Sequence, residues 1–174
     1  MATTELKLLF KAENPDQEGA SLIEVLVSLV ILSTGLLGMF GLQTISLMNV
    51  HTSHLRTQAA VMAADIIERI HANAQGFSAG SYAAPGGQLS QACFSTVGCS
   101  SSALAMHDLE EWRTALLTVL PYGEGVICRD SSPADGTPLV HNCDGFGEDH
   151  VVKIWWDGQR KGIAEQRLII SVRI

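Results

Sequence analysis

The feature that most constrains this chain is a long stretch near its N-terminus that carries no charge. Between Glu24 and Arg56 there is no Asp, Glu, Lys or Arg, and the 24 residues from Val25 to Met48 are mostly apolar. As a helix these 24 residues would span roughly 36 Å, at 1.5 Å per residue. The hydrocarbon core of a bilayer is about 30 Å thick. A buried core helix is the alternative, but core helices seldom run so long without a charge, so we predict a membrane-spanning helix.

The overall composition fits one folded domain beside this segment. The chain has 174 residues, of which 47% are hydrophobic and 17% charged, and disordered chains show the opposite balance of low hydrophobicity and high charge. The formal net charge is −7. No basic patch stands out, so we expect no nucleic-acid partner.

The residues before the apolar stretch do not make an ordinary secretory signal. Residues 1–19 end in a polar, acidic sequence, and the border between polar and apolar residues lies at 18–21. A secretory signal is cut after its apolar stretch, at a site of small residues. No such site follows Met48, where two histidines and an arginine come instead. We therefore expect the apolar segment to remain in the mature protein.

Glu24 is the only charge at the start of this segment. A carboxylate at that depth costs a few kcal/mol unless it is paired or lies near the interface. Glu24 could simply mark the interfacial end of the helix. Alternatively, cleavage after Gly19 would create an amino group on Ala20, one helical turn away, which could pair with Glu24 of the same chain or of a neighbouring copy.

Residues 19–32, GASLIEVLVSLVIL, resemble the N-terminal signature of the type IV pilin family. In that family a prepilin peptidase cuts after the glycine and usually methylates the new N-terminus. The resemblance implies processing at Gly19 and Ala20, and a role in subunit assembly for Glu24, which matches the glutamate at the family's fifth mature position. Two features depart from the family pattern: Ala20 stands where Phe is usual, and the leader holds two lysines and four acids although such leaders are commonly basic.

Further segments are similar to the PilV-like minor pilins, also described as type IV pilus modification proteins. They are residues 63–73, 108–113, 120–125 and 151–157. The resemblance implies a minor pilin that helps to initiate pilus assembly in a tip or priming complex. The implied partners are other minor pilins, the major pilin, prepilin peptidase, the inner-membrane assembly machinery and the lipid bilayer. The implied location is the inner membrane, single-pass with a periplasmic head, and then the pilus.

The helical pattern continues past the apolar segment. Leu55, Ala59, Met62, Ile66 and Ile70 recur at steps of three and four residues, which indicates an amphipathic helix. We predict one helix over about residues 21–73, whose second half docks onto a small head, with Gly76 as its stop.

The predicted fold is α+β and type IV pilin-like, with a long N-terminal helix packed on a small antiparallel β-sheet head. Its expected parts are a leader peptide (1–19), the transmembrane and polymerisation half of the helix (20–48), and a periplasmic head that includes the amphipathic half of the helix (49–174).

Three glycines interrupt the apolar half of the helix, and each costs about 0.8–1 kcal/mol relative to Ala. They are Gly35, Gly38 and Gly41. They permit close helix packing in the membrane, or they make a weak stretch that extends when the subunit leaves the bilayer for a filament. We favour the second interpretation slightly, because pilins resembling this chain are thought to extend near the matching region.

The rest of the head shows a loop, a helix and strands. Residues 76–105 are rich in Gly, Ser and Ala and predict a loop. Asp108 is a candidate N-cap for a helix that ends at Leu120, before a proline. Residues 150–156 and 167–174 alternate apolar and polar side chains, the pattern of half-buried antiparallel strands. A third strand is expected at 126–128.

Four cysteines follow the apolar segment: Cys93, Cys99, Cys128 and Cys143. In an oxidising compartment they would form two disulfides, with three possible pairings. We favour Cys93–Cys99 and Cys128–Cys143, because both close short loops. The alternative is a metal site that uses Cys143 with two nearby histidines, His141 and His150, but the sequence has no C-x-x-C or H-x-x-x-H pair.

Nothing in the sequence indicates catalysis or a cofactor. The acidic, Gly-rich residues 144–149 hint at calcium but lack the register of an EF-hand loop. The other histidines, His51, His54, His71 and His107, are expected on solvated helix faces or at helix ends. We find no G-x-S-x-G motif and expect no catalytic, cofactor-binding or metal residues. Two rival functions stay open: a type II secretion pseudopilin, and a periplasmic enzyme or binding protein held by an uncleaved signal anchor.

Overall fold

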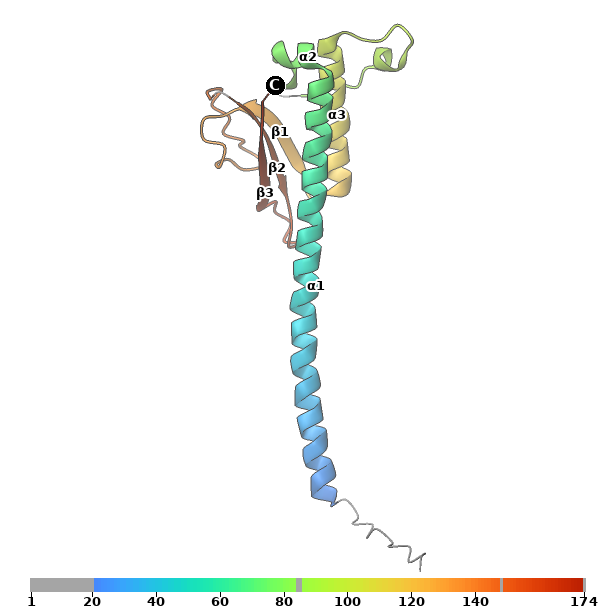
Figure 1. Ribbon diagram of the computed structural model, residues 1–174, viewed down its shortest axis with the longest axis vertical. Helices are drawn as coiled ribbons and strands as arrows, with labels where there is room; N and C mark the ends of the chain where they lie inside the picture. Colours follow the sequence, from blue (N-terminus) through green and yellow to red (C-terminus); the bar gives the residue numbers. More distant parts are fainter. Residues whose placement is uncertain (1–20, 84–85, 148, 174) are drawn as a thin grey trace, which may run out of the picture. The chain divides into compact units, whose positions relative to one another are not determined.

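The computed structural model describes residues 21–83, 86–147 and 149–173 (Figure 1). The chain divides into two compact units, residues 1–45 and residues 46–174. Helix α1 (Leu22–Ala72) contributes residues to both. The prediction of one helix over residues 21–73 is therefore confirmed to within one residue at each end. The expected leader, including Gly19 and Ala20, lies outside the described residues.

The described part of the first unit is the apolar half of α1, residues 21–45. Every one of these residues is exposed, so no other part of the chain that the structure describes covers them. Their hydroxyl groups donate to backbone carbonyls three or four residues earlier, at 2.7–3.0 Å, from Ser28, Ser33, Thr34 and Thr44. Internal bonds of this kind satisfy polar groups where no water is available, so these hydroxyls are compatible with a bilayer.

The glycines of this half have open surroundings. A Cβ added at Gly35, Gly38 or Gly41 would meet nothing within 4 Å. No contact among the residues that the structure describes therefore requires glycine there. Both interpretations of these glycines involve a partner molecule or a change of conformation.

The second unit combines the rest of α1 with short helices, one further long helix and a sheet. Its elements in chain order are α2 (Ala74–Ser78), η1 (Ser81–Ala83), η2 (Gln91–Phe94), α3 (Ser101–Val119), β1 (Glu124–Arg129), β2 (His150–Trp156) and β3 (Gln166–Val172). The three strands form one antiparallel sheet in the order β1-β2-β3. This is the predicted α+β, type IV pilin-like arrangement of a long N-terminal helix with a small antiparallel sheet.

One face of the sheet packs against α1 and α3. From β2 it contributes Val152, Ile154 and Trp156, all 1% exposed or less. Trp112 of α3 is completely buried, and its indole N–H donates to the carbonyl of Met62 in α1 at 2.8 Å. Trp112 thus packs in the core and also bonds α3 to α1.

The opposite face of β2 is also buried, which the sequence did not predict. Val151, Lys153 and Trp155 are each 2% exposed or less. The connection between β1 and β2, residues 130–149, covers them: it bonds to the Lys153 ammonium and stacks His141 on Trp155, with ring centroids 5.3 Å apart. The expectation of a half-buried strand at 150–156 was right in its bounds and wrong in its exposure.

The start of α3 is a second correction. The helix begins at Ser101, and the Ser100 hydroxyl caps it by accepting from the N–H of Ala103 at 3.2 Å. Asp108, the predicted cap, lies in the middle of the helix and is buried. The prediction failed because Asp108 makes long-range contacts that local cap preference does not show, while Ser100 offers an equally good cap.

The end of α1 is a third correction. Gly76 does not end α1, because the helix already ends at Ala72. Asn73 then caps α2, its side chain accepting from the N–H of Gly76 at 3.2 Å. Gly76 lies inside α2, where an added Cβ would come within 2.7 Å of the Ser101 carbonyl. The glycine is therefore needed for close packing and not for a helix stop.

Candidate functional site

The first candidate site is the beginning of α1. Ser21 precedes the helix, and its carbonyl accepts from the N–H groups of Glu24 at 2.9 Å and of Val25 at 3.2 Å. Glu24 therefore lies in the first helical turn, where the helix dipole favours a carboxylate. Its side chain is exposed and makes no ion pair with any residue that the structure describes. A cation for Glu24 must come from residue 20 or before, or from another molecule.

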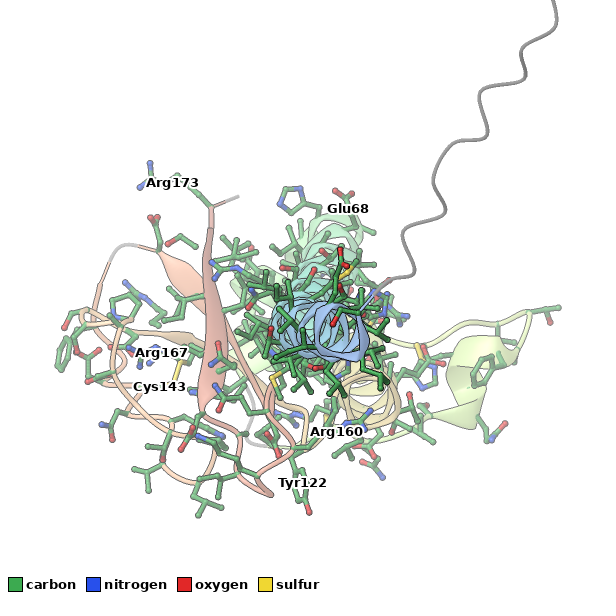
Figure 2. The ribbon with its side chains drawn as sticks, turned by 90° about the horizontal axis from the view of Figure 1, so that it is seen from below. Glu68, Tyr122, Cys143, Arg160, Arg167 and Arg173 are labelled. Atoms are coloured by element: carbon green, nitrogen blue, oxygen red, sulfur yellow. A yellow bond between two sulfur atoms is a disulfide. The ribbon has the colours of Figure 1, made fainter. Side chains whose placement is uncertain are left out.

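The cysteines form the second candidate set. Cys93 is bonded to Cys99, with a Cα–Cα distance of 4.7 Å, and Cys128 to Cys143, at 6.0 Å. These are the pairings that the sequence favours. Cys128 is at the end of β1 and Cys143 in the following connection, so the second bond holds that connection against the sheet (Figure 2).

Lys153 is a buried charge that sequence reasoning missed. Its side chain is 0% exposed and contacts Asp130, the Asp135 carboxylate at 3.4 Å and the His141 carbonyl at 3.0 Å. A buried ion pair is tolerated only when its geometry and further hydrogen bonds are good. Lys153 meets that condition and ties three points of the 130–149 connection to β2. The alternating pattern puts Lys153 on the solvated face of the strand, and the available signal against this was that its neighbours on that face, Val151 and Trp155, are apolar.

A polar network joins α1 to α3. The Arg69 guanidinium contacts Asp65 at 3.1 Å, Asp108 at 3.3 Å and Glu111 at 2.8 Å. The hydrogen bond from Arg69 holds the pKa of Glu111 below its ordinary value. Tyr82 donates to Asp108 at 2.6 Å, and burial followed by this bond raises the pKa of Tyr82 well above its ordinary value. The network orients helices, and its groups are all engaged with one another.

His107 is buried and not on a solvated face, which corrects the sequence expectation. Its Nδ1 accepts from the N–H of Ser90 at 3.2 Å, and its ring meets that of Phe94 edge to face, with centroids 4.9 Å apart. His107 thus holds the segment with the Cys93–Cys99 loop against α3. Sequence alone could not show this because residues 86–99 have no periodic pattern.

The possible metal ligands do not form a metal site. The nearest cluster is Cys128, Asp130 and Cys143, whose ligand atoms lie within 4.8 Å of one another. The thiolate is the form of cysteine that binds metals, but these two sulfurs are bonded to each other and Asp130 accepts from Lys153. Of the two histidines considered with Cys143, His141 stacks on Trp155 and His150 lies against Phe77.

The acidic residues 144–149 form a turn in the part that the structure describes. Asp144 accepts from the N–H of Phe146 at 2.7 Å and of Ser131 at 3.1 Å, and Asp149 pairs with Arg173 at 2.8 Å. Bonds from the Ser131 hydroxyl and from Phe146 lower the pKa of Asp144. Asp144 and Asp149 are thus both engaged with groups of the chain itself.

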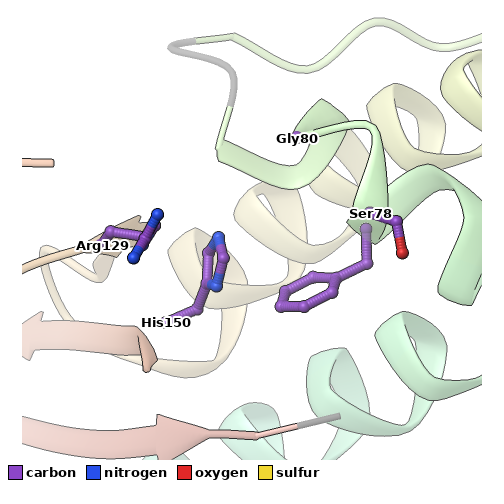
Figure 3. A pocket seen from close by; sticks show the side chains of 5 residues that line it. Ser78, Gly80, Arg129 and His150 are labelled. Carbon is purple, nitrogen blue, oxygen red and sulfur yellow. The ribbon is translucent and has the colours of Figure 1, made fainter. Parts of the chain in front are cut away.

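A pocket of about 330 Å³ lies between α2 and the strands (Figure 3). It is lined by Phe77, Ser78, Gly80, Arg129 and His150. The Ser78 hydroxyl donates to the Ala74 carbonyl at 2.9 Å and is not paired with the histidine. Burial, with the charge of Arg129, lowers the pKa of His150 and so favours its neutral form. The lining provides no nucleophile activated by a base.

Two family models match the chain. A model of the prokaryotic N-terminal methylation motif matches residues 14–40, and one described as type IV pilin Tt1218 matches residues 41–110. No curated protein and no solved structure matches significantly. The first match contains Gly19, Ala20 and Glu24.

These observations define first a class of protein. α1 has a window of mean hydropathy 2.3 and is long and apolar enough to cross a membrane, and the second unit is an α+β fold closed by disulfides. That is a membrane-anchored pilin-like protein. The two matches together run from residue 14 to residue 110, and the chain belongs to the type IV pilin family. This family is structural, and its members assemble with other pilins after processing by prepilin peptidase.

Proposed function

We propose that this chain is a minor type IV pilin that helps to initiate pilus assembly, in a tip or priming complex with other minor pilins. It has no catalytic role in this proposal. Its second unit lies in the periplasm while α1 anchors it in the inner membrane, and it later enters the pilus.

The observation that carries the proposal is the position of Glu24. It lies exposed in the first turn of α1, and nothing in the described chain covers the apolar half of that helix, residues 22–50. Prepilin peptidase cuts after Gly19 and leaves the amino group of Ala20, which is methylated or free. Glu24 then neutralises the amino group of an adjacent subunit. An ion pair is strongest where water is scarce, so this contact selects subunits that are packed side by side in the membrane.

The minor role is supported by the similarity to PilV-like pilins. That similarity includes residues 108–113, where the structure places Asp108 and Glu111 in the network with Arg69 and Trp112 in the core. The disulfides support a periplasmic location, because such bonds persist in oxidising compartments. A type II secretion pseudopilin would share the N-terminal machinery and differ in its assembly partners.

The test is Glu24→Gln in cells that lack the wild-type gene. We expect normal processing, measured as the intact mass of the chain from membranes, but at least a tenfold loss of pili per cell and of co-purified minor pilins. Glu68→Gln is the matched control, because Glu68 is an exposed glutamate on the same helix and should leave both readouts unchanged.

Three outcomes would contradict the proposal. Normal pilus numbers and normal partner recovery in Glu24→Gln would remove the role of Glu24. Retention of Met1 in cells with active prepilin peptidase would remove the processing step. Normal piliation with a defect in protein secretion after deletion of the whole gene would favour the pseudopilin.

A further inference from the structure

The second unit begins close to the end of the apolar segment. Residues 22–50 of α1 are all exposed, His51 and Thr52 are half-buried, and the first buried side chain is Leu55, at 5% exposure. The apolar run ends at Met48, so the fold starts three to seven residues later, or about 5–10 Å at 1.5 Å per residue. The headgroup layer is about 5–7 Å thick on each side of the hydrocarbon core. If the apolar run spans the hydrocarbon core, this edge of the fold comes within reach of the headgroups.

The end of α3 belongs to the same edge, because α3 runs antiparallel to α1. Asn73 bonds to Ser101, Arg69 to Asp108, and Trp112 to Met62. Continuing this alignment for eight residues beyond Trp112 places the end of α3 level with about residue 54 of α1.

The turn between β2 and β3 joins the end of α3. The N–H of Asp157 donates to the carbonyl of Pro121 at 2.8 Å. A Cβ added at Gly162 would meet only the Tyr122 hydroxyl, at 4.0 Å. Seen from below, Tyr122 and Arg160 lie on the same side of this unit (Figure 2). We call the two turns, residues 121–123 and 157–165, the base.

The base exposes an unusual set of side chains. Tyr122 is 65% exposed and Ile163 54%, and Arg160 and Lys161 are also exposed. Tyr122 and Arg160 have φ angles of 53° and 55°, in the left-handed region that bulky residues avoid. Strained residues persist where the surrounding structure holds them and are concentrated at functional sites.

This combination is typical of a membrane–water interface. Tyrosine is enriched there because its ring is apolar and its hydroxyl polar. Arginine and lysine lay their apolar stems along the boundary and place their charges among phosphates. The base thus offers both kinds of contact at the depth where lipid headgroups lie.

The charges of this edge are also compatible with anionic lipid. The edge carries three basic side chains, Arg56, Arg160 and Lys161, and two exposed or half-buried acids, Glu124 and Glu165. Glu165 pairs with Lys161 at 3.4 Å. A third acid, Asp157, is buried, and its carboxylate accepts hydrogen bonds from the backbone N–H groups of Gln159 and Gly162. The whole chain has a net charge of −7, whereas this edge is near neutral and its Arg160 makes no ion pair with any residue that the structure describes. The edge is therefore repelled less by an anionic surface than the net charge of the chain would suggest.

We infer that the base rests on anionic phospholipid headgroups of the membrane that anchors the chain before assembly. Arg160 and Lys161 bind lipid phosphates, and Tyr122 and Ile163 enter the headgroup layer. This rests on the membrane anchoring in the proposed function, and not on the role in priming. Its consequence is that the unassembled subunit is held at the membrane by its fold as well as by α1.

The test uses the full chain in nanodiscs of phosphatidylcholine alone or with 30% phosphatidylglycerol, with hydrogen–deuterium exchange of peptides that cover the base. We expect exchange about fivefold slower in the anionic discs at low salt, the effect of about one basic residue near an anionic surface. The difference should disappear at high salt, because screening is then strong.

The variant R160Q/K161Q should exchange equally in both discs. The matched control is R129Q/R173Q, which removes two exposed charges from the opposite end of the sheet and should keep the fivefold difference. Equal exchange of the wild type in both discs would overturn the inference without any variant, as would loss of the effect in the control. Protection that appears only in assembled pili would overturn it too, and would make the base a contact between subunits. None of these results depends on pilus initiation.

Discussion

The two halves of α1 both carry apolar side chains, but these are covered in different ways. Residues 22–50 are exposed without exception, although they are the most apolar part of the chain. Beyond them, Leu55, Ala59, Ala63, Ile66 and Ile70 are buried by the chain's own fold. One half thus depends on a bilayer or on other subunits, and the other on α3 and the sheet. Folding and assembly should therefore respond to substitutions in separate halves of the same helix.

The largest effect is expected in the second unit, where burial is complete. Lys153→Ala leaves the buried carboxylate of Asp130 without its partner, and breaking such a pair costs about 3–5 kcal/mol. Urea unfolding of the detergent-solubilised chain should show this loss. Lys161→Ala, at an exposed pair, should change the free energy of unfolding by under about 0.5 kcal/mol. Equal effects would mean that the 130–149 connection does not depend on Lys153.

A matched pair of isoleucines tests the comparison itself. Ile66 is 0% exposed and Ile31 is 66% exposed, both on α1. Ile66→Ala should destabilise the second unit by about 2–5 kcal/mol through a cavity. Ile31→Ala should leave that unfolding transition unchanged and act only on membrane insertion or pilus assembly. If Ile31→Ala lowered the unfolding free energy as much, the two halves would not be independent.

The two disulfides allow a finer comparison within the second unit. The Cys128–Cys143 loop spans 15 residues and the Cys93–Cys99 loop six. Loop-closure entropy predicts a loss of about 3 kcal/mol when the first is replaced by serines and about 2 kcal/mol for the second. Thermal or urea unfolding of the two double variants measures the difference. A larger loss from the six-residue loop would mean that its attachment through His107 matters more than loop length.

The smallest effect is on pH dependence. Burial and Arg129 hold the pKa of His150 below its ordinary value of 6.5. The folded state therefore resists protonation: the stabilisation is complete above about pH 6.5 and is lost as pH falls through the lower folded pKa. The change should be under about 1 kcal/mol because the ring is partly solvated. His150→Phe, compared with wild type by urea unfolding from pH 7.5 to 5, should flatten this slope, and an unchanged slope would assign it to another histidine.

Sequence reasoning succeeded where a local pattern decided the structure. The charge-free run and the stripe from Leu55 to Ile70 gave α1 to within a residue, because helical periodicity repeats many times over such a length. The alternation of apolar and polar side chains correctly predicted the bounds of β2. The preference for short loops led to the same two cysteine pairs that the structure contains.

It failed where a distant partner decided. Asp108 reads locally as a helix cap, but Tyr82 and Arg69 hold it inside α3. His107 reads as a surface residue until the 86–99 segment lies over it. The alternating pattern places Lys153 on the solvated face of a strand, because no residue near it in the sequence indicates that Asp130 and Asp135 will contact it. In each case the deciding contact joins residues that are more than ten positions apart.

The connection that covers the outer face of β2, residues 130–149, has inner side chains that hold it in place and outer side chains that make few contacts. Its inner contacts, Lys153 with Asp130 and the Cys128–Cys143 bond, hold it in place whatever its outer residues are. Its outer side chains touch little: Leu139 is 94% exposed. Substitution there should leave the core intact, so this outer surface could gain or lose a recognition property without a change of fold.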